Sequence, residues 1–151
     1  MASDPLYFLG LNVTGTSDPK LHMTICLVPE PKAESSRFTD ELEALSKAVL
    51  PVTLILGNNA LFGKDATIPV RMVTIADAAK RDLIEAFMLT HHRPPASDVH
   101  RGAKQVFHLS VKDLSPMEAE TLTEVKGTSL SLGLVGGKGK TIWKSSGQEN
   151  V

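Results

Sequence analysis

The sequence contains a single cysteine, Cys26, among 151 residues. One cysteine forms neither an intrachain disulfide nor a cysteine-cluster zinc or iron–sulfur site, so these classes of protein are excluded and a reducing compartment is favoured. An excess of positive charge is also missing, since 16 Lys and Arg stand against 17 Asp and Glu. Binding a long nucleic acid through many phosphates needs such an excess. The composition therefore argues against a long nucleic acid but permits a small charged ligand.

Long apolar runs are absent as well. No stretch approaches the length of a membrane-spanning helix, and the first residues lack the basic start and apolar run of a signal peptide. No Pro- or Gly-rich linker divides the chain, and 151 residues, 42% of them hydrophobic, suffice for one sizeable core. We therefore expect a monomeric, cytoplasmic protein with a single domain over residues 1–151.

Hydrophobic patterning predicts the order of strands and helices. Strands are expected at 6–13, 21–28, 52–56, 68–75, 105–111, 124–134 and 140–144, with a loop at 57–67. Apolar residues recur at helical spacing in 41–49 and 77–90, and a short helix or turn is expected at 115–121. This order predicts an α+β fold with two similar lobes, in which two antiparallel sheets surround a central groove and the helices lie outside.

One short pattern occurs twice. Residues 21–25 and 107–111 each place a histidine and a hydroxyl residue two positions apart inside an apolar frame: His22 with Thr24, and His108 with Ser110. Because side chains alternate across a strand, each pair shares one face. If both strands face the groove, two imidazoles and two hydroxyls converge on a volume suited to a phosphate group.

Two imidazoles and two hydroxyls favour phosphodiester cleavage. Histidine titrates near neutrality, so one imidazole can accept a proton from an attacking hydroxyl or water while a second, protonated one donates to the leaving oxygen. Thr24 and Ser110 can donate hydrogen bonds to non-bridging phosphoryl oxygens and thereby stabilise charge in the transition state. This chemistry needs no metal and no cofactor, and we predict neither.

The paired His-x-Thr/Ser motifs, each followed by an apolar residue, resemble those of the two-histidine (2H) phosphoesterase superfamily. That superfamily includes bacterial RNA ligase-like enzymes, cyclic phosphodiesterases and viral enzymes that degrade 2′,5′-oligoadenylate. The resemblance implies that His22 and His108 are the catalytic general acid and base, in an order that the sequence leaves open. It also implies that Thr24 and Ser110 bind the substrate phosphate.

The resemblance implies a hydrolase that cleaves 2′,5′-linked oligonucleotides or cyclic nucleotides, the latter being 2′,3′-cyclic phosphates or cyclic di- and trinucleotide signals. Where the ligase-like branch often has an arginine shortly after a motif, this chain has only Lys112. Its compact length is similar to that of minimal viral or phage enzymes that act against host defence. The alternatives are a non-catalytic module that binds RNA ends or nucleotides, an RNA ligase-like activity, and a scaffold in which both motifs are structural.

Aromatic residues make up only 5% of the chain, and three of them are candidates for stacking on a base. Tyr7 and Trp143 are the main candidates for the groove, with Phe62 as a third, because aromatic faces bind bases with little sequence demand. Strand alternation places Cys26 on the face of His22. Its apolar surroundings argue against a nucleophilic role.

Loop residues offer two further patterns. His91, His92 and His100 suggest a metal site, but their polar, proline-broken segment favours solvated histidines, with His92 or Arg93 at the groove edge. The stretch 136–141 resembles a phosphate-binding loop, but Gly139-Lys140-Thr141 lacks the required glycine at position 134. A hairpin turn is expected there.

Overall fold

The structure is a computed structural model that describes residues 5–18, 20–62, 65–91, 107–135 and 140–145. The strands are β1 (Leu6–Thr14), β2 (His22–Pro29), β3 (Val52–Phe62), β4 (Ile68–Ile75), β5 (His108–Ser110), β6 (Glu124–Leu134) and β7 (Thr141–Lys144). The helices are α1 (Glu30–Ala33), α2 (Ser36–Val49), α3 (Ala78–His91) and α4 (Pro116–Thr121). Each expected strand and helix has a counterpart among these elements, and α1 is an addition that directly follows β2. Of the strand expected at 105–111, β5 covers only 108–110, and residues 105–106 lie outside the described residues.

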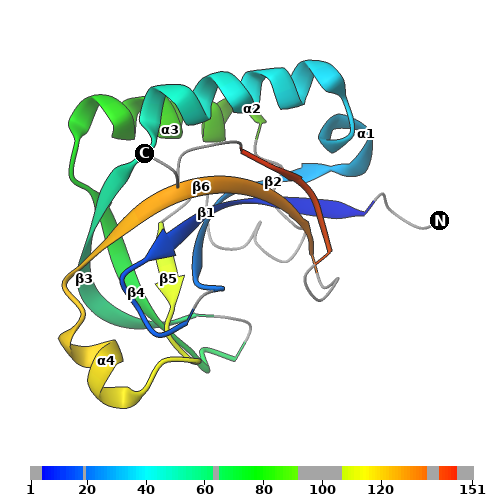
Figure 1. Cartoon of the computed structure of the whole chain (residues 1–151). Helices are drawn as coiled ribbons and strands as arrows, with labels where there is room; N and C mark the ends of the chain where they lie inside the picture. Colours follow the sequence, from blue (N-terminus) through cyan, green and yellow to red (C-terminus); the bar gives the residue numbers. More distant parts are fainter. Residues whose placement is uncertain (1–4, 19, 63–64, 92–106, 136–139, 146–151) are drawn as a thin grey trace.

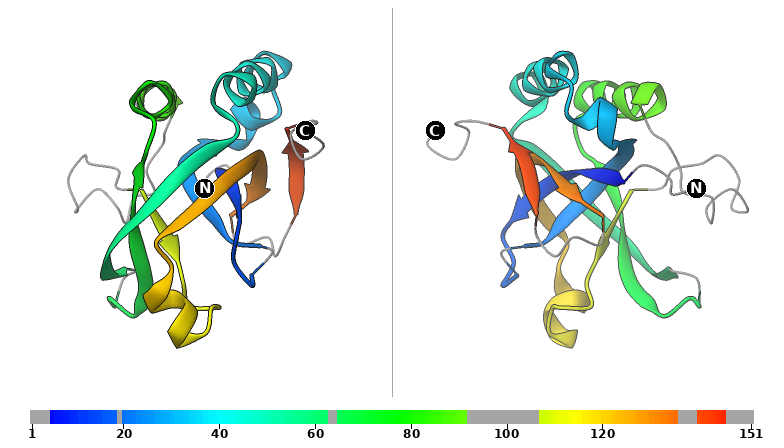
Figure 2. Two further views of the ribbon diagram at one scale, coloured as in Figure 1. Left: turned by 60° about the vertical axis from the view of Figure 1, so that its left-hand side comes forward. Right: turned by 90° about the vertical axis from the view of Figure 1, so that its right-hand side faces the viewer.

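All of these strands belong to one antiparallel sheet, in the order β1-β2-β5-β4-β3-β6-β7. Because β6 pairs with β3 near its start and with β1 along most of its length, the sheet closes into a six-stranded barrel, and β7 adds to β6. Figure 2 shows the strands wrapping around below the helices. The antiparallel α+β architecture is thus confirmed. The strands expected in two sheets are instead hydrogen-bonded into one, because β5 pairs with both β2 and β4 and the long β6 pairs with both β1 and β3.

Helices α2 and α3 lie side by side on one side of the sheet (Figure 1). α2 begins after Ser35, whose hydroxyl accepts a hydrogen bond from the backbone N–H of Phe38 at 3.4 Å. This bond satisfies one of the donors that a helix start leaves free. Buried side chains of both helices join Met23 and Leu109 of the sheet in one hydrophobic cluster. Of the helices in the described ranges, none is both long and apolar enough to cross a membrane.

A bulge in β2 changes which of its side chains face the core. Two consecutive residues of β1 pair with Cys26 and Thr24, so Ile25 is an extra residue without a partner in the ladder. Ile25 and Cys26 are consequently both fully buried. The expectation that Cys26 shares the face of His22 is therefore wrong. Burial in the core raises the pKa of the Cys26 thiol to about 12, although Lys32 acts in the opposite direction.

Strand β3 is longer than the sequence predicted. It continues through a second bulge, between Leu56 and Asn59, as far as Phe62, where a loop was expected. A bulge accommodates residues that interrupt the regular ladder, so the polar Asn58 and Asn59 do not end the strand. The extension carries Phe62 to His108, which it contacts at a ring-centroid distance of 4.3 Å.

Candidate active site

The register between β2 and β5 decides where the two motifs lie. Met23 of β2 pairs with Leu109 of β5, and both are fully buried in the core. Residues on either side of an antiparallel pair oppose one another, with Cβ atoms about 4.5–5.5 Å apart. The register therefore places the histidine of each motif opposite the hydroxyl residue of the other: His22 opposite Ser110, and His108 opposite Thr24. All four side chains lie on the face away from the core.

These four side chains line a single pocket of about 670 Å³. Small-molecule sites typically have volumes of roughly 300–1,000 Å³. Most of the other lining residues are polar or charged, and the set is completed by Ser17, Asp18, Lys20, Leu21, Lys112 and Asp113. The structure thus brings together the four residues that the sequence motifs predicted to converge.

The imidazole of His22 is held from two directions. Its Nδ1 lies 3.2 Å from the backbone carbonyl oxygen of Lys20. When Nδ1 carries the hydrogen donated to that carbonyl, Nε2 is the nitrogen left for chemistry. The ring also stacks on Phe8 of β1, with centroids 4.8 Å apart and planes inclined by only 16°. A carbonyl and an aromatic face therefore define the orientation of this imidazole.

Two glycines make room for the Phe8 ring. A Cβ atom placed on Gly133 would lie 2.6 Å from Phe8 Cζ, and one on Gly10 would lie 3.2 Å from Phe8 Cε2 and 3.3 Å from His22 Cδ2. Gly133 pairs with Phe8 across the β1–β6 ladder. The absence of side chains at these positions lets the phenyl ring lie flat beside the imidazole.

His108 and Ser110 lie on the other side of the pocket. The Phe62 ring is inclined by 51° to the imidazole of His108, so each motif histidine contacts a phenylalanine from another strand. Ser110 Oγ is buried and has no hydrogen-bond partner among the described residues. A buried hydroxyl without a partner costs free energy, roughly 1–3 kcal/mol. A ligand oxygen bound in this pocket would offer the missing partner once the Ser110 side chain adopts a rotamer that turns Oγ into the pocket.

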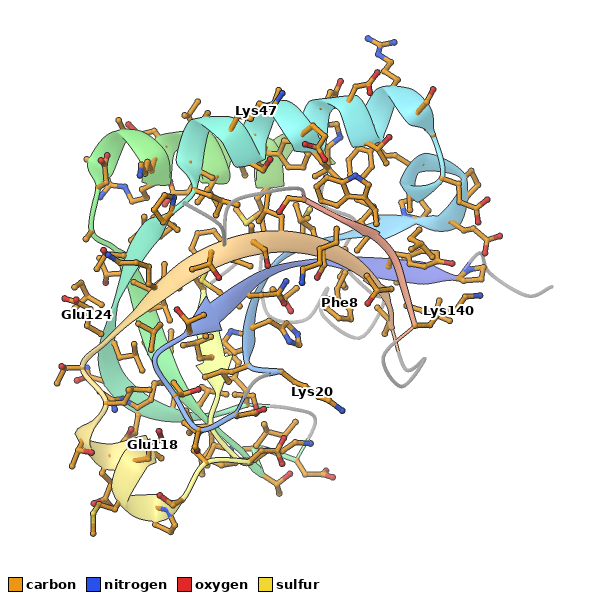
Figure 3. The ribbon with its side chains drawn as sticks, in the orientation of Figure 1. Phe8, Lys20, Lys47, Glu118, Glu124 and Lys140 are labelled. Atoms are coloured by element: carbon orange, nitrogen blue, oxygen red, sulfur yellow. The ribbon has the colours of Figure 1, made fainter. Side chains whose placement is uncertain are left out.

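Charges of both signs surround the pocket. Lys20 and Lys112 are exposed and line it together with Asp18 and Asp113. The Asp18 carboxylate already accepts a hydrogen bond from the backbone N–H of Lys20 at 2.9 Å. Figure 3 shows Lys20 and Phe8 on the side of the sheet away from Lys47 of α2. The two ammonium groups and the two carboxylates cancel in formal charge, so any attraction of an anion to this pocket is local to the lysines.

The structure corrects the expected aromatic groove residues. Tyr7 is only 2% exposed and belongs to the core, so its ring is inaccessible to a base. Trp143 is half-buried, pairs with Leu132 and packs against the core, and it does not line the pocket. Phe8 instead contacts a motif histidine, and sequence reasoning missed it. Because adjacent residues of a strand point to opposite faces, Phe8 and Tyr7 could be assigned to different faces of β1 from the sequence. Which of the two faces the site depended on the β1–β2 register.

His91 lies at the end of α3, away from the pocket lining. Its Nε2 is 3.0 Å from the Glu41 carboxylate, and its ring contacts Phe38 and Phe87. Burial and the nearby Lys32 charge lower the pKa of His91, while Glu41 acts in the opposite direction. This histidine therefore ties α3 to α2 as part of the helix packing.

Other loop predictions concern residues that the structure does not describe. His92, Arg93, His100 and the stretch 136–139 all lie outside the described residues, so the expectations for them are unchanged. Within the described part of the chain, no three His, Cys, Asp or Glu side chains gather as metal ligands do.

The sequence was compared with protein-family models and with curated proteins. No protein-family model matches the chain, and no curated protein matches it in sequence.

Proposed function

We propose that the protein is a metal-independent phosphodiesterase of the two-histidine type, which cleaves a 2′,5′-linked or cyclic nucleotide. One observation carries the proposal: two histidines and two hydroxyl residues, from motifs far apart in the chain, line the same pocket in a cross-strand arrangement. A single His-x-Thr pattern is common by chance. Two such patterns meeting in one pocket are what acid–base catalysis at a phosphate requires.

In the proposed reaction, one imidazole takes the proton of the attacking hydroxyl or water, and the other gives a proton to the leaving oxygen. His22 takes part through Nε2, because its Nδ1 faces the Lys20 carbonyl. The hydroxyls of Thr24 and Ser110 donate to the non-bridging phosphoryl oxygens as negative charge grows there. Either histidine can be the base, with the other as the acid. The reaction products tell whether a ribose hydroxyl or water is the attacking group.

The proposed substrate is a small nucleotide, and the enzyme is a cytoplasmic monomer. A near-neutral chain does not need a basic surface if it holds one phosphate by two imidazoles, two hydroxyls and two rim lysines. In the two-lobed arrangement of the superfamily, β2 would belong to the first lobe and β5 to the second. The pocket then lies over their junction, which supports assigning the fold to that superfamily.

The test is incubation of the purified protein with a panel of substrates, followed by chromatography of the products. The panel contains 2′,5′-linked adenylates, 2′,3′-cyclic nucleotides and cyclic dinucleotides. We expect at least one to be cleaved, and His22→Ala and His108→Ala each to lower the rate by about 10²–10⁴-fold, the usual contribution of an acid or base. A product ending in a 2′,3′-cyclic phosphate indicates attack by a ribose hydroxyl, whereas a simple monophosphate indicates water.

Matched controls separate chemistry from folding. Both variants should retain the wild-type circular dichroism spectrum and still bind the cleaved substrate. Full activity in either variant contradicts the proposal. Binding without turnover in the wild type identifies a nucleotide-binding module, and joining of RNA ends in place of cleavage identifies a ligase-like activity.

A further inference from the structure

The turn between β1 and β2, described at residues 15–18 and 20–21, forms one wall of the pocket. Four of its residues line the pocket: Ser17, Asp18, Lys20 and Leu21. The carbonyl oxygen of Lys20 lies 3.2 Å from Nδ1 of His22, so this turn supplies the acceptor that orients the imidazole. Whatever holds the turn in place therefore also decides which ring nitrogen is left for the substrate.

The peptide group between Lys20 and Leu21 is held at both of its ends. Its N–H, which belongs to Leu21, donates to the carbonyl oxygen of Asp18 at 3.3 Å. Its carbonyl oxygen faces Nδ1 of His22. Because a trans peptide unit is planar, its N–H and C=O point in opposite directions, and the bond to Asp18 sets the direction of the carbonyl. The Asp18 carboxylate also accepts the backbone N–H of Lys20 at 2.9 Å. Asp18 thus aims the carbonyl at the imidazole.

Glu118 of α4 holds the turn one residue before Asp18. Its carboxylate accepts a hydrogen bond from the backbone N–H of Ser17 at 3.0 Å, and its second oxygen accepts one from the Ser17 hydroxyl. Hydrogen bonds to a charged acceptor are stronger than neutral ones, and two of them fix orientation as well as distance. Figure 3 shows Glu118 on α4, at the end of the sheet where this turn lies.

Helix α4 is tied to the sheet and so gives Glu118 a fixed support. The guanidinium of the buried Arg71 in β4 donates to the carbonyl oxygen of Ala119 in α4 at 2.7 Å and to that of Gly57 in β3 at 2.7 Å. At the start of the helix, Ser115 Oγ accepts the backbone N–H of Glu118 at 3.2 Å. The carboxylate of Glu118 therefore reaches the turn from a helix whose position is set by the barrel.

We propose that Glu118 is a positioning residue for His22. By holding the turn at Ser17, it keeps the Lys20 carbonyl aimed at the imidazole. Nδ1 then carries the hydrogen, and Nε2 is left for the substrate phosphate. Without Glu118, the carbonyl is held less firmly, and the other tautomer of His22 gains population. The effect on turnover rests on the proposed phosphodiesterase function, whereas the tautomer of His22 is a property of the protein alone.

The experiment measures the tautomer ratio of His22 from the chemical shifts of its two ring nitrogens. These are recorded by ¹H–¹⁵N NMR at about pH 9, where an imidazole is neutral, and the spectrum of His22→Ala identifies the signals. We expect the Nδ1–H form to predominate in the wild type. Glu118→Ala should lower the ratio of Nδ1–H to Nε2–H by about 2- to 10-fold, the usual net contribution of one hydrogen bond.

Turnover gives a second readout with a panel substrate that the wild type cleaves. Glu118→Ala should lower kcat by about 2- to 10-fold. This holds whether His22 is the acid or the base, because the ring loses its fixed orientation in either role. A tautomer ratio that is unchanged in Glu118→Ala overturns the inference, and so does an unchanged kcat.

Three further variants separate this contact from a general effect on α4. Glu118→Gln keeps one oxygen that accepts a Ser17 donor, so it should restore part of the tautomer ratio and of kcat. Ser17→Ala removes the hydroxyl donor but keeps the backbone N–H, so its tautomer ratio should be intermediate. Glu120→Ala, which removes another exposed carboxylate of the same helix, should leave both values unchanged. If Glu118→Ala fails to fold, Ser17→Ala decides, and a wild-type ratio there overturns the inference.

The failures of the two proposals are distinguishable. If the wild type cleaves a panel substrate but Glu118→Ala changes neither value, the positioning role is wrong and the phosphodiesterase assignment stands. If the wild type cleaves no member of the panel, that assignment is wrong, and the tautomer ratio alone decides whether Glu118 positions His22.

Discussion

Replacement of Gly133 by alanine tests whether the packing around Phe8 holds the imidazole of His22. The new Cβ would lie 2.6 Å from Phe8 Cζ and 2.8 Å from Phe8 Cε1, whereas carbon atoms at optimal contact are about 3.5–4.0 Å apart. The phenyl ring has little room to retreat, because the imidazole stacks on it at 4.8 Å and Gly10 lies close by. Overpacking of this kind costs about 1–3 kcal/mol. In a chain of this size, that cost lowers Tm by roughly 2–12 °C.

The assay is a double-mutant cycle of Gly133→Ala and Phe8→Leu, in which the free energy of unfolding of each variant is measured in urea. Since the leucine removes the ring that the new methyl group strikes, Gly133→Ala should cost much less in the Phe8→Leu background, giving a coupling free energy of about 0.5–3 kcal/mol. Proton NMR adds a direct readout. The ring protons of His22 should be shifted upfield by the phenyl face in the wild type, less so in Gly133→Ala, and not at all in Phe8→Leu.

A control glycine is available in β3. A Cβ on Gly57 meets no atom closer than the backbone oxygen of Met72 at 3.7 Å, so Gly57→Ala should change stability by no more than about 0.5 kcal/mol. If the stability costs of Gly133→Ala and Phe8→Leu are additive, or if the His22 ring protons have the same chemical shifts in both variants as in the wild type, Phe8 does not hold the imidazole as described.

Three more predictions concern Ser110, His91 and the need for a metal ion. Ser110→Ala should lower kcat by about 10²–10³-fold. It should not lower the free energy of unfolding in urea, because the buried hydroxyl of Ser110 has no partner among the described residues. A clear loss of stability would contradict this. Because folding lowers the pKa of His91 from 6.5, the unfolded chain binds that proton more tightly. The stability contributed by the neutral ring is fully present above pH 6.5 and is lost as the pH falls through the lowered pKa. The difference in unfolding free energy between wild type and His91→Phe, measured in urea, should therefore shrink on acidification. Prolonged treatment with EDTA should leave phosphodiesterase activity unchanged, and activity that disappears and returns with a divalent cation would argue for metal ligands.

Local rules account for much of what could be predicted. A histidine and a hydroxyl residue two positions apart on a strand share a face whatever the rest of the chain does, so each motif could be recognised on its own. The start of α2 after Ser35 follows an equally local rule, because the cap satisfies a donor three residues away, although the spacing of apolar residues predicted the helix only over 41–49. The burial of Tyr7 and the approach of Phe8 to the site were not predictable in this way, because both depend on which face of β1 meets the core.

By itself, the amino-acid sequence determined the α+β class, the approximate positions of most strands and helices, and the two His-x-Thr/Ser motifs. The tertiary structure alone decided that Met23 pairs with Leu109, which makes the two motifs cross-strand neighbours. It also decided the bulge that sends Cys26 into the core, the closure of the sheet through β6, and the contact of Glu118 with Ser17. The physical reason is that strand register and bulges are set by hydrogen bonds and packing between segments far apart in the chain, for which the local sequence pattern carries no signal.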